Sequence, residues 1–305
     1  MEISGLGGET MSGKETKDVV FSVVTPVRNE GRTIKDTIES VIKQTIRPKR
    51  WVIIDDGSTD NTGEILKAYA EKNDWIEVLH FEDKGYSDYE MAHRKLGAGL
   101  ERLLQYQNDY IVKMDGDITF ESNYFEEIFR RFDADPQLGI AGGVFYVLDG
   151  GQYVLESSPL YHVRGASKIY RWKCWEDIGG FVHKLGYDTI DEIQAHMKGW
   201  KTRSFPELKV IHHRKTFTRK GKLGSAVYQG KLNYLVWYHP LYVILKSAKF
   251  SLTRKPYFFY GAAFIYGFLK CYAIGLQRSI NDEEFKRYIR GQQLRKLMFR
   301  STILK

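Results

Sequence analysis

Short apolar segments alternate with amphipathic ones between Val19 and about Lys215. The apolar segments are rich in β-branched residues, which is typical of strands, and the amphipathic ones place apolar residues at helical spacing. Strands that alternate with helices predict an α/β fold with a mostly parallel sheet flanked by helices. We expect strands at 19–25, 51–54, 76–80, 110–114 and 208–211, and helices at 33–44, 62–71 and 92–105.

The chain changes character after Lys215. Residues 216–222 are basic and contain a glycine, which predicts a loop, and two aromatic, apolar stretches follow at 234–246 and 257–276. We therefore interpret the 305 residues as a flexible tail (1–18), an α/β domain (19–215) and a basic, aromatic and helical C-terminal region (216–305).

The stretch 257–276 is long enough to cross a bilayer, but it contains Lys270 and four tyrosines, which suit a membrane interface better than its core. Three interpretations stay open: an interfacial or re-entrant membrane contact, a spanning helix, and a soluble helical core. The segment after Phe285 carries seven Lys and Arg residues and no acid. It favours contact with an anionic membrane surface, although a solvated amphipathic helix has the same pattern.

Charge and composition narrow the classes of partner. The chain has 46 Lys and Arg against 38 Asp and Glu, so its formal net charge of +8 favours anionic ligands. The basic residues follow apolar stretches and form no zinc finger or RNP-type motif, so we expect no nucleic-acid partner.

Two cysteines exclude a disulfide framework and fit a reducing compartment. The first 18 residues lack the apolar run of a signal peptide, so we expect a cytoplasmic location.

Acidic clusters follow several predicted strands, at the edge where sheets of this class bind ligands. DDGSTDNT at 55–62 offers carboxylates to sugar or base groups, but it is also typical of a turn with helix caps. DGD at 115–117 places two carboxylates around a glycine, a pattern that suits a divalent cation shared with a ligand's phosphates. A lone DxD is common in turns, and the second acidic strand end strengthens the metal-binding interpretation.

Three further motifs are ambiguous on composition alone. TPVRNE at 25–30 ends the first predicted strand and either forms a connecting loop or meets an anion. The acids of a predicted helix at 188–197 either complement the helix dipole or include a general base. The pair His212-His213 follows a predicted strand and is either packed or metal-ligating.

Taken in order, these segments resemble a family 2 glycosyltransferase of the GT-A type. The resemblance covers about Val19 to Lys215 and consists of VVTPVRNE at 23–30, DDGSTDNT at 55–62, DGD at 115–117, and an acid-bearing helix that ends in Gly-Trp at 199–200. Each motif is modestly specific, whereas the ordered set is highly specific. A dinucleotide-binding dehydrogenase does not fit, since no GxGxxG follows the first strand.

The resemblance implies a nucleotide site and a metal site. Asp56 would contact the base, usually uracil, with support from Asp55. Asp117 would bind Mg²⁺ or Mn²⁺, Asp115 would face the ribose or the metal, and His213, with His212 as second choice, would add a metal or phosphate contact. The implied nucleotide-binding residues are Thr25, Pro26, Arg28, Glu30, Asp55, Asp56, Arg94 and Asp115.

The resemblance also implies a catalytic base on the acid-bearing helix. The family usually carries Glu-Asp, with the Asp as base, eleven residues before the glycine that ends the helix, and Asp188 occupies that place before Gly199. Tyr187 replaces the usual Glu. That departure leaves Asp191 and Glu192 as rival candidates, and we favour Asp188.

The activity implied is metal-dependent inverting transfer of a sugar from a nucleotide-sugar, most often a UDP-sugar, to a glycan or lipid-linked acceptor. Cell-envelope or exopolysaccharide synthesis at the inner face of the membrane fits this activity by analogy. The alternatives are transfer to a polyprenyl phosphate, and a non-catalytic protein that binds nucleotide-sugars or membranes.

Overall fold

The computed structural model describes residues 18–302, apart from 83–88, 157, 183 and 215–220. The side chains of 89–94 are also outside the description. The tail expected at 1–18 and the loop expected at 216–222 therefore fall almost entirely on residues that are not described.

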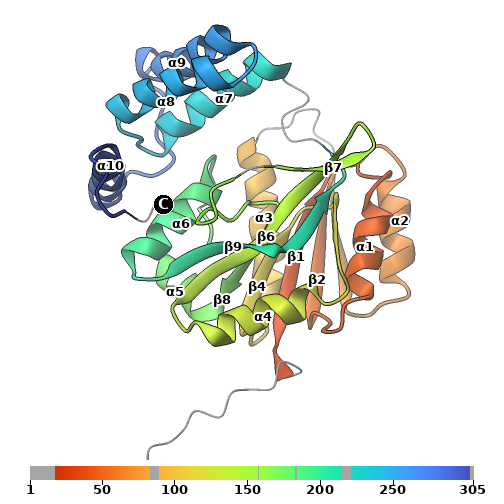
Figure 1. Cartoon of the computed structure of the whole chain (residues 1–305). Coiled ribbons are helices and arrows are strands. Elements are labelled where there is room, and N and C mark those ends of the chain that lie inside the picture. The colour runs from red at the N-terminus through yellow and green to blue at the C-terminus, as the bar shows by residue number, and fades with distance from the viewer. Residues whose placement is uncertain (1–17, 83–88, 157, 183, 215–220, 303–305) are drawn as a thin grey trace, which may run out of the picture.

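One sheet organises the α/β part of the molecule (Figure 1). Its strands run in the order β3-β2-β1-β4-β8-β6-β9-β5, and β7 pairs with β6. All five strands expected from the sequence are present, β9 being longer than expected. The strands are β1 Phe21–Val27, β2 Arg50–Asp56, β3 Ile76–Phe81, β4 Tyr110–Met114, β5 Ile118–Phe120, β6 Leu138–Asp149, β7 Gln152–Leu155, β8 Ser167–Arg171 and β9 Lys201–His212.

The expectation of a mostly parallel sheet holds only in part. Strands β1, β2, β3 and β4 are mutually parallel, and β6 is parallel to β9. In contrast, β8 is antiparallel to both β4 and β6, β7 is antiparallel to β6, and β5 is antiparallel to β9. The β6–β7 pair is a hairpin whose turn is Gly150-Gly151, and such a short turn joins only antiparallel strands. The sheet is therefore mixed.

Helices cover both faces of the sheet and continue into a C-terminal group. The four helices expected in the α/β part are present as α1, α2, α3 and α6, within a few residues of their predicted bounds. The helices are α1 Ile34–Ile42, α2 Thr62–Ala70, α3 Tyr89–Leu103, α4 Tyr124–Ala134, α5 Trp172–Ile178, α6 Tyr187–Met197, α7 Gly221–Leu235, α8 Pro240–Thr253, α9 Tyr257–Ala273 and α10 Glu283–Leu297.

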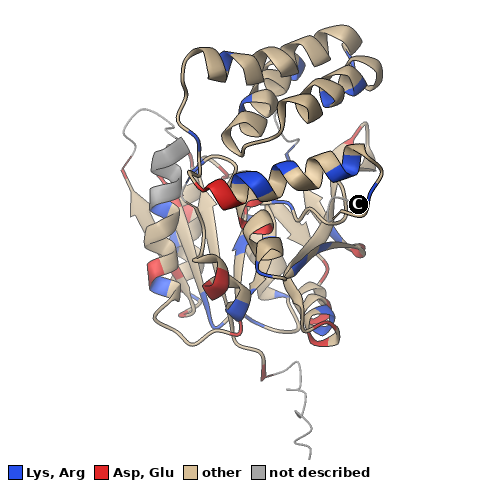
Figure 2. Cartoon of the chain, turned by 90° about the vertical axis from the view of Figure 1, so that its left-hand side faces the viewer, with Lys and Arg blue, Asp and Glu red and all other residues tan. Residues whose placement is uncertain are grey.

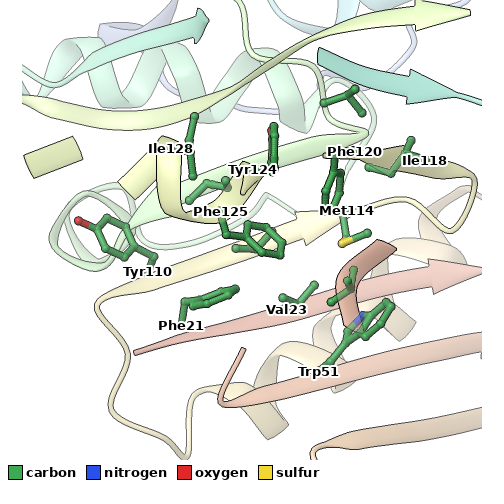
Figure 3. Close-up of a cluster of buried hydrophobic side chains, with 14 of the residues drawn as sticks. Phe21, Val23, Trp51, Tyr110, Met114, Ile118, Phe120, Tyr124, Phe125 and Ile128 are labelled. Carbon is green, nitrogen blue, oxygen red and sulfur yellow. The ribbon is translucent and has the colours of Figure 1, made fainter. Parts of the chain in front are cut away.

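The core has one layer on each face of the sheet. On one face Phe21 contacts Phe125 and Phe129 of α4, with ring centroids 4.9 Å apart in both pairs (Figure 3). On the other face the buried residues Val24 and Leu100 pack in a second cluster with α3, α5 and α6. Burial of both sheet faces explains why the parallel strands read as continuous apolar runs in the sequence.

Helices α7, α8 and α9 pack together above the sheet, and α10 lies beside α6 (Figure 1). Helices α7 and α9 approach so closely that a Cβ on Gly267 would lie 2.0 Å from the carbonyl oxygen of Val227. Helix α9 buries Tyr260, Phe264 and Phe268 on one face and exposes the other. Within the described ranges, no helix is both long enough and apolar enough to cross a membrane.

Candidate active site

A cavity of about 1400 Å³ opens between the sheet and the C-terminal helices. Its sheet side includes Pro26 at the end of β1 and Asp115 after β4, and α6 contributes Asp188. Its opposite wall comes from α8 and α10, with Tyr242 and Lys296 among the lining residues. The cavity thus lies at the carboxyl ends of the parallel strands, where the sequence places its acids.

Asp117 is buried at this edge, with 3% of its surface exposed. Its Oδ2 atom lies 3.1 Å from a guanidinium nitrogen of Arg214 and 3.5 Å from Nε2 of His212. Burial alone would raise the pKa of Asp117, but His212 and Arg214 lower it below the usual range. Asp115 is more open and forms an ion pair with Lys113. Both carboxylates therefore lie beside cations.

The two histidines of the motif have different surroundings. His212 is buried between Asp117 and Glu156, whose Oε2 lies 3.2 Å from Nδ1. Burial lowers the pKa of His212, but these two carboxylates outweigh it and raise the pKa to about 9. His213 is exposed, and its Nε2 lies 2.9 Å from the hydroxyl of Thr119. The structure thus brings the ring of His212, the second choice, to the Asp117 carboxylate. His213 contacts Asp117 only through its backbone N–H, which donates to the Asp117 carbonyl at 2.9 Å, and its ring lies at Thr119.

The expected nucleotide-binding loops are braced against each other. The backbone N–H of Glu30 donates to the hydroxyl of Thr62 at 2.9 Å, and the backbone N–H of Thr59 donates to the side chain of Asn29 at 2.8 Å. Asp60 accepts from the backbone N–H of Thr62, so part of the DDGSTDNT segment has the turn role that was its alternative interpretation.

Asp55 and Asp56 lie side by side at the end of β2 but face different partners. Asp55 is buried, accepts from the backbone N–H of Ser58 at 2.9 Å, and lies 2.9 Å from Nδ1 of His80. Asp56 is less enclosed and forms an ion pair with Lys95 of α3. Asp56 is therefore the more accessible of the two for a ligand, and Asp55 shapes the loop that carries it.

The remaining expected nucleotide residues are spread over the same edge. Thr25 is buried and accepts from the indole N–H of Trp51 at 2.9 Å, so its side chain faces the core. Arg28 is half-buried after β1. Glu30 pairs with Arg214 at 2.6 Å, which links this loop to the Asp117 cluster. Arg94 belongs to α3, but its side chain lies outside the described residues.

Two of the three acids on α6 are engaged in a buried network. Asp191 accepts from the ammonium of Lys168 at 2.8 Å and from the hydroxyl of Tyr170. Glu192 lies 2.8 Å from Nδ1 of His162 and 3.1 Å from Lys168 Nζ. Burial alone would lower the pKa of Lys168, but these acids outweigh it and raise the pKa, so the ammonium stays charged.

Asp188 differs from these acids in being only half-buried. It lies in the first turn of α6 and lines the cavity, as the buried Glu192 also does. Lys168 donates to its backbone carbonyl rather than to its side chain. Tyr187, which stands in place of the usual Glu, is buried, and a Cβ on Gly165 would lie 2.7 Å from its hydroxyl. Of the three candidates, Asp188 is thus the most exposed one, and it lines the cavity.

A family model places this geometry among known proteins. The model of glycosyl transferase family 2 matches residues 22–182, just over half of the chain. The chain belongs to glycosyl transferase family 2. It is therefore interpreted as a glycosyltransferase, and the non-catalytic alternative is not retained.

Curated relatives from this family match parts of the chain. "Glycosyltransferase GlyG" of Streptococcus pneumoniae is 27% identical over 154 residues, 47% of this chain and 48% of the relative. "Glycosyltransferase GlyA" of the same organism is 28% identical over 224 residues, 72% of this chain and 28% of the relative. A poly-β-1,6-N-acetyl-D-glucosamine synthase of Staphylococcus aureus is 32% identical over 38% of this chain and 26% of its own length. The chain therefore spans half or less of each of these proteins.

Solved structures show the same fold at low sequence identity. TarS of S. aureus, solved with UDP-GlcNAc, superposes with a TM-score of 0.52 at 16% identity, covering 91% of this chain and 81% of that one. The mannosyltransferase PcManGT of Pyrobaculum calidifontis, solved with GDP-Man and Mn²⁺, gives a TM-score of 0.51 at 15% identity, covering 83% and 73%. These similarities support the GT-A fold expected from the sequence motifs.

Sequence reasoning missed several residues of the family 2 site. Arg214, Glu156 and Arg164 complete the ion-pair cluster around Asp117 and His212. Glu156 and Arg164 follow no strand end with a recognisable motif, so no local signal marks them. Arg214 directly follows the histidine pair in the sequence. Its position beside Asp117 depends on the pairing of β5 with β9, which local sequence does not reveal.

The buried network predicts that Asp191 and Asp188 differ in their effect on stability. Asp191→Asn leaves the Lys168 ammonium buried beside a neutral partner, so we expect the free energy of unfolding to fall by about 3 kcal/mol. Asp188→Asn alters a half-exposed side chain, so we expect a change below about 1 kcal/mol. Urea denaturation of both variants measures the difference. Equal losses of stability would contradict a structural role for Asp191.

Proposed function

We propose that the chain transfers a sugar, with inversion, from a nucleotide-sugar to a hydroxyl of a glycan or lipid-linked acceptor, and that the transfer depends on a divalent metal. The observation that carries this proposal is the placement of Asp115 and Asp188 on the sheet side and the α6 side of one cavity. A single displacement at an anomeric carbon needs charge relief for the leaving diphosphate and a base for the acceptor hydroxyl, and these two acids divide the roles.

The donor side fits a metal bound to few protein ligands. Asp115 and Asp117 offer hard oxygen ligands, and His212 lies beside Asp117, which supports His212 rather than His213 as a further contact. Among the residues that the structure describes, no group of three or more His, Cys, Asp and Glu side chains forms a metal cage. Such a set suits Mg²⁺ or Mn²⁺ completed by substrate phosphates, and PcManGT was solved with Mn²⁺. When bound, the metal would neutralise the leaving diphosphate.

His212 and Arg214 have a second role at this site. With a pKa of about 9, His212 is cationic at neutral pH, and Arg214 is a permanent cation. Both therefore balance the charge of Asp117 before a metal arrives. A metal ligand must be deprotonated, so metal binding is expected to release a proton from His212 if that ring becomes a ligand.

A donor panel tests this half of the proposal. We expect metal-dependent binding and slow hydrolysis of one sugar among UDP-, GDP- and dTDP-sugars, with EDTA abolishing both. TarS was solved with UDP-GlcNAc, which favours a UDP-sugar. Asp117→Ala should remove the metal dependence, while the exposed His213→Ala should keep it. Failure of folded protein to bind any donor would reject the transferase proposal for this chain.

The acceptor side needs a base whose backbone is fixed but whose carboxylate is not neutralised by a buried ion pair. Asp188 suits this role because Lys168 donates to its backbone carbonyl and because the half-buried residue lines the cavity. In the proposed step Asp188 takes the proton of the acceptor hydroxyl as its oxygen bonds to the anomeric carbon. The bond between that carbon and the donor phosphate oxygen breaks, and the nucleoside diphosphate leaves.

Removal of this base should abolish transfer without loss of donor binding. We expect Asp188→Asn to lower turnover by about 10²–10⁴-fold with an unchanged donor dissociation constant. Glu71→Gln serves as the control, because it neutralises an exposed carboxylate at the end of α2, away from the cavity. Product analysis should show inverted configuration. Transfer lost only in Asp191→Asn, in protein that is still folded, would move the base to Asp191.

An exposed apolar tip supports membrane association. Leu252, Phe258 and Phe259 lie around the connection between α8 and α9 with 79%, 69% and 65% of their surfaces exposed. Arg254 and Lys255 lie between them in the same connection. Bulky apolar side chains beside cations are typical of segments that enter the interface of an anionic membrane. We propose that this tip contacts the membrane and holds the active site near lipid-linked acceptors, including polyprenyl phosphate.

Vesicle pelleting tests the membrane contact. We expect the protein to bind vesicles of mixed phosphatidylglycerol and phosphatidylcholine at low salt and to dissociate at high salt, because screening weakens the basic contribution. Substitution of Leu252, Phe258 and Phe259 by Ser should lower binding at least tenfold. The matched control is Tyr153→Ser with Val154→Ser, which removes exposed apolar residues from β7 instead. Equal binding of all variants would exclude this tip as the contact.

A further inference from the structure

Helix α8 buries Val243 and Phe250 as a surface helix normally does, but its remaining sides combine exposed apolar residues with cations that line the cavity. Its outer side exposes Leu241, Ile244 and Leu252, whereas Lys246 and Lys249 line the cavity together with Tyr242. A surface helix normally directs apolar residues inward and charges outward. The inward cations therefore need an explanation in terms of what occupies the cavity.

Four cations line this end of the cavity: Lys246, Lys249, Arg254 and Lys296. Among the described residues, neither Lys246 nor Lys249 nor Arg254 forms an ion pair with a carboxylate. Figure 2 shows Lys and Arg, in blue, along α10 and on the helices above it. Like charges that lack a carboxylate partner repel one another, so an anion bound beside Lys246, Lys249 and Arg254 would relieve that repulsion.

Lys246 is the centre of this group. Its ammonium donates to the side-chain oxygen of Asn233 at 3.1 Å and lies 5.2–5.7 Å from the rings of Tyr238, Phe250 and Phe264. Burial lowers its pKa to about 8, and the charges of Arg254 and Lys296 act in the same direction. An ammonium held by aromatic faces and one amide keeps donors available for a ligand.

The position of the group relates it to the acceptor rather than to the donor. Tyr238 lies 5.2 Å from Lys246, measured from its ring centroid, and it lines the same cavity as Asp188 and Glu192 of α6. The donor acids Asp115 and Asp117 lie on the sheet side. A cavity of about 1400 Å³ exceeds the usual range for one small ligand and can hold two substrates at once.

We propose that the C-terminal helices bind a phosphate or diphosphate group of the acceptor through Lys246, Lys249, Arg254 and Lys296, so that the acceptor hydroxyl reaches Asp188. An Arg guanidinium and several ammonium groups suit phosphate oxygens. Carboxylated glycans are disfavoured because four cations exceed the charge of one carboxylate. This inference rests on the proposed transfer reaction, because it names the acceptor class of that same site.

The phosphate can belong to a prenyl-type lipid or to a soluble phosphorylated glycan, and two probes separate these sources. Inorganic pyrophosphate carries the charge alone, and farnesyl diphosphate adds an apolar chain. Titration of the full chain with each probe in EDTA, which removes the metal that donor binding is expected to need, measures binding away from the donor site. Farnesyl diphosphate binding at least tenfold more tightly than pyrophosphate indicates a lipid-linked acceptor, and equal binding indicates a soluble one.

Variants decide whether the cations form the site. We expect Lys246→Met to weaken both probes at least tenfold, Arg254→Gln to act in the same direction, and Lys246→Arg to restore most of the affinity. Lys72→Met, which removes an exposed charge after α2, should bind as the unmodified chain does. UDP-sugar binding should change less than twofold in all four variants. Circular dichroism confirms that each is folded, and Met in place of a buried ammonium keeps the side-chain volume.

Two outcomes would overturn the inference. Unchanged probe binding by Lys246→Met and Arg254→Gln would show that these cations hold no phosphate. An equal loss of UDP-sugar binding would assign them to the donor instead. Probe binding is measured without a donor, so it can be tested even if no donor binds. The acceptor inference can therefore fail while the transferase proposal stands.

Discussion

The buried ammonium of Lys168 is the interaction on which the arrangement of the site depends. It lies on β8 in the middle of the sheet and contacts Asp191, Glu192 and the backbone carbonyl of Asp188, all on α6. Glu192 in turn holds His162 and the backbone N–H of Val163. A fully buried cation is tolerated only when it is surrounded by acceptors, so the network fixes the start of α6 against the sheet. Because α6 also contacts α10, the same network sets where the C-terminal helices close the cavity.

Local sequence patterns predicted the elements whose apolar and amphipathic character is visible along the chain itself. Strands β1 to β4 are apolar runs between acids and amphipathic helices, and each was predicted close to its observed bounds. Strand β8 escaped prediction because it contains Lys168, whose burial depends on acids more than twenty residues further along the chain. Strand β6 escaped because of its glycines, which close contacts require: a Cβ on Gly143 would lie 2.2 Å from the carbonyl oxygen of Leu208.

In the candidate site, too, the sequence predicted what local spacing determines and left open what tertiary packing determines. The spacing to Gly199 favoured Asp188, which is half-buried and lines the cavity. Composition alone did not exclude Asp191, whose burial depends on Lys168 of β8. The alternation of side chains along a strand distinguishes the two histidines. Leu208, Val210 and His212 lie at every second position of β9 and share its buried side. His213 falls outside that alternation. The sequence marked the segment after Phe285 as basic, but it did not place Lys246 and Lys249 in the cavity, since their direction depends on how α8 packs.

The two ends of the cavity differ in how their charges are compensated, and this difference bears on the order of the proposed reaction. At the sheet edge Asp115 pairs with Lys113, and Asp117 pairs with His212 and Arg214, so acids and cations alternate there. At the other end Lys246, Lys249 and Arg254 line the cavity without a carboxylate partner among the described residues. A divalent cation at the sheet edge would have to compete with the cations that already surround the two acids, whereas an anion at the other end would meet ammonium groups that no acid balances. It follows that the two phosphate-bearing substrates of the proposed reaction differ in what they must bring: the donor brings a divalent cation with its diphosphate, and the acceptor brings the negative charge alone.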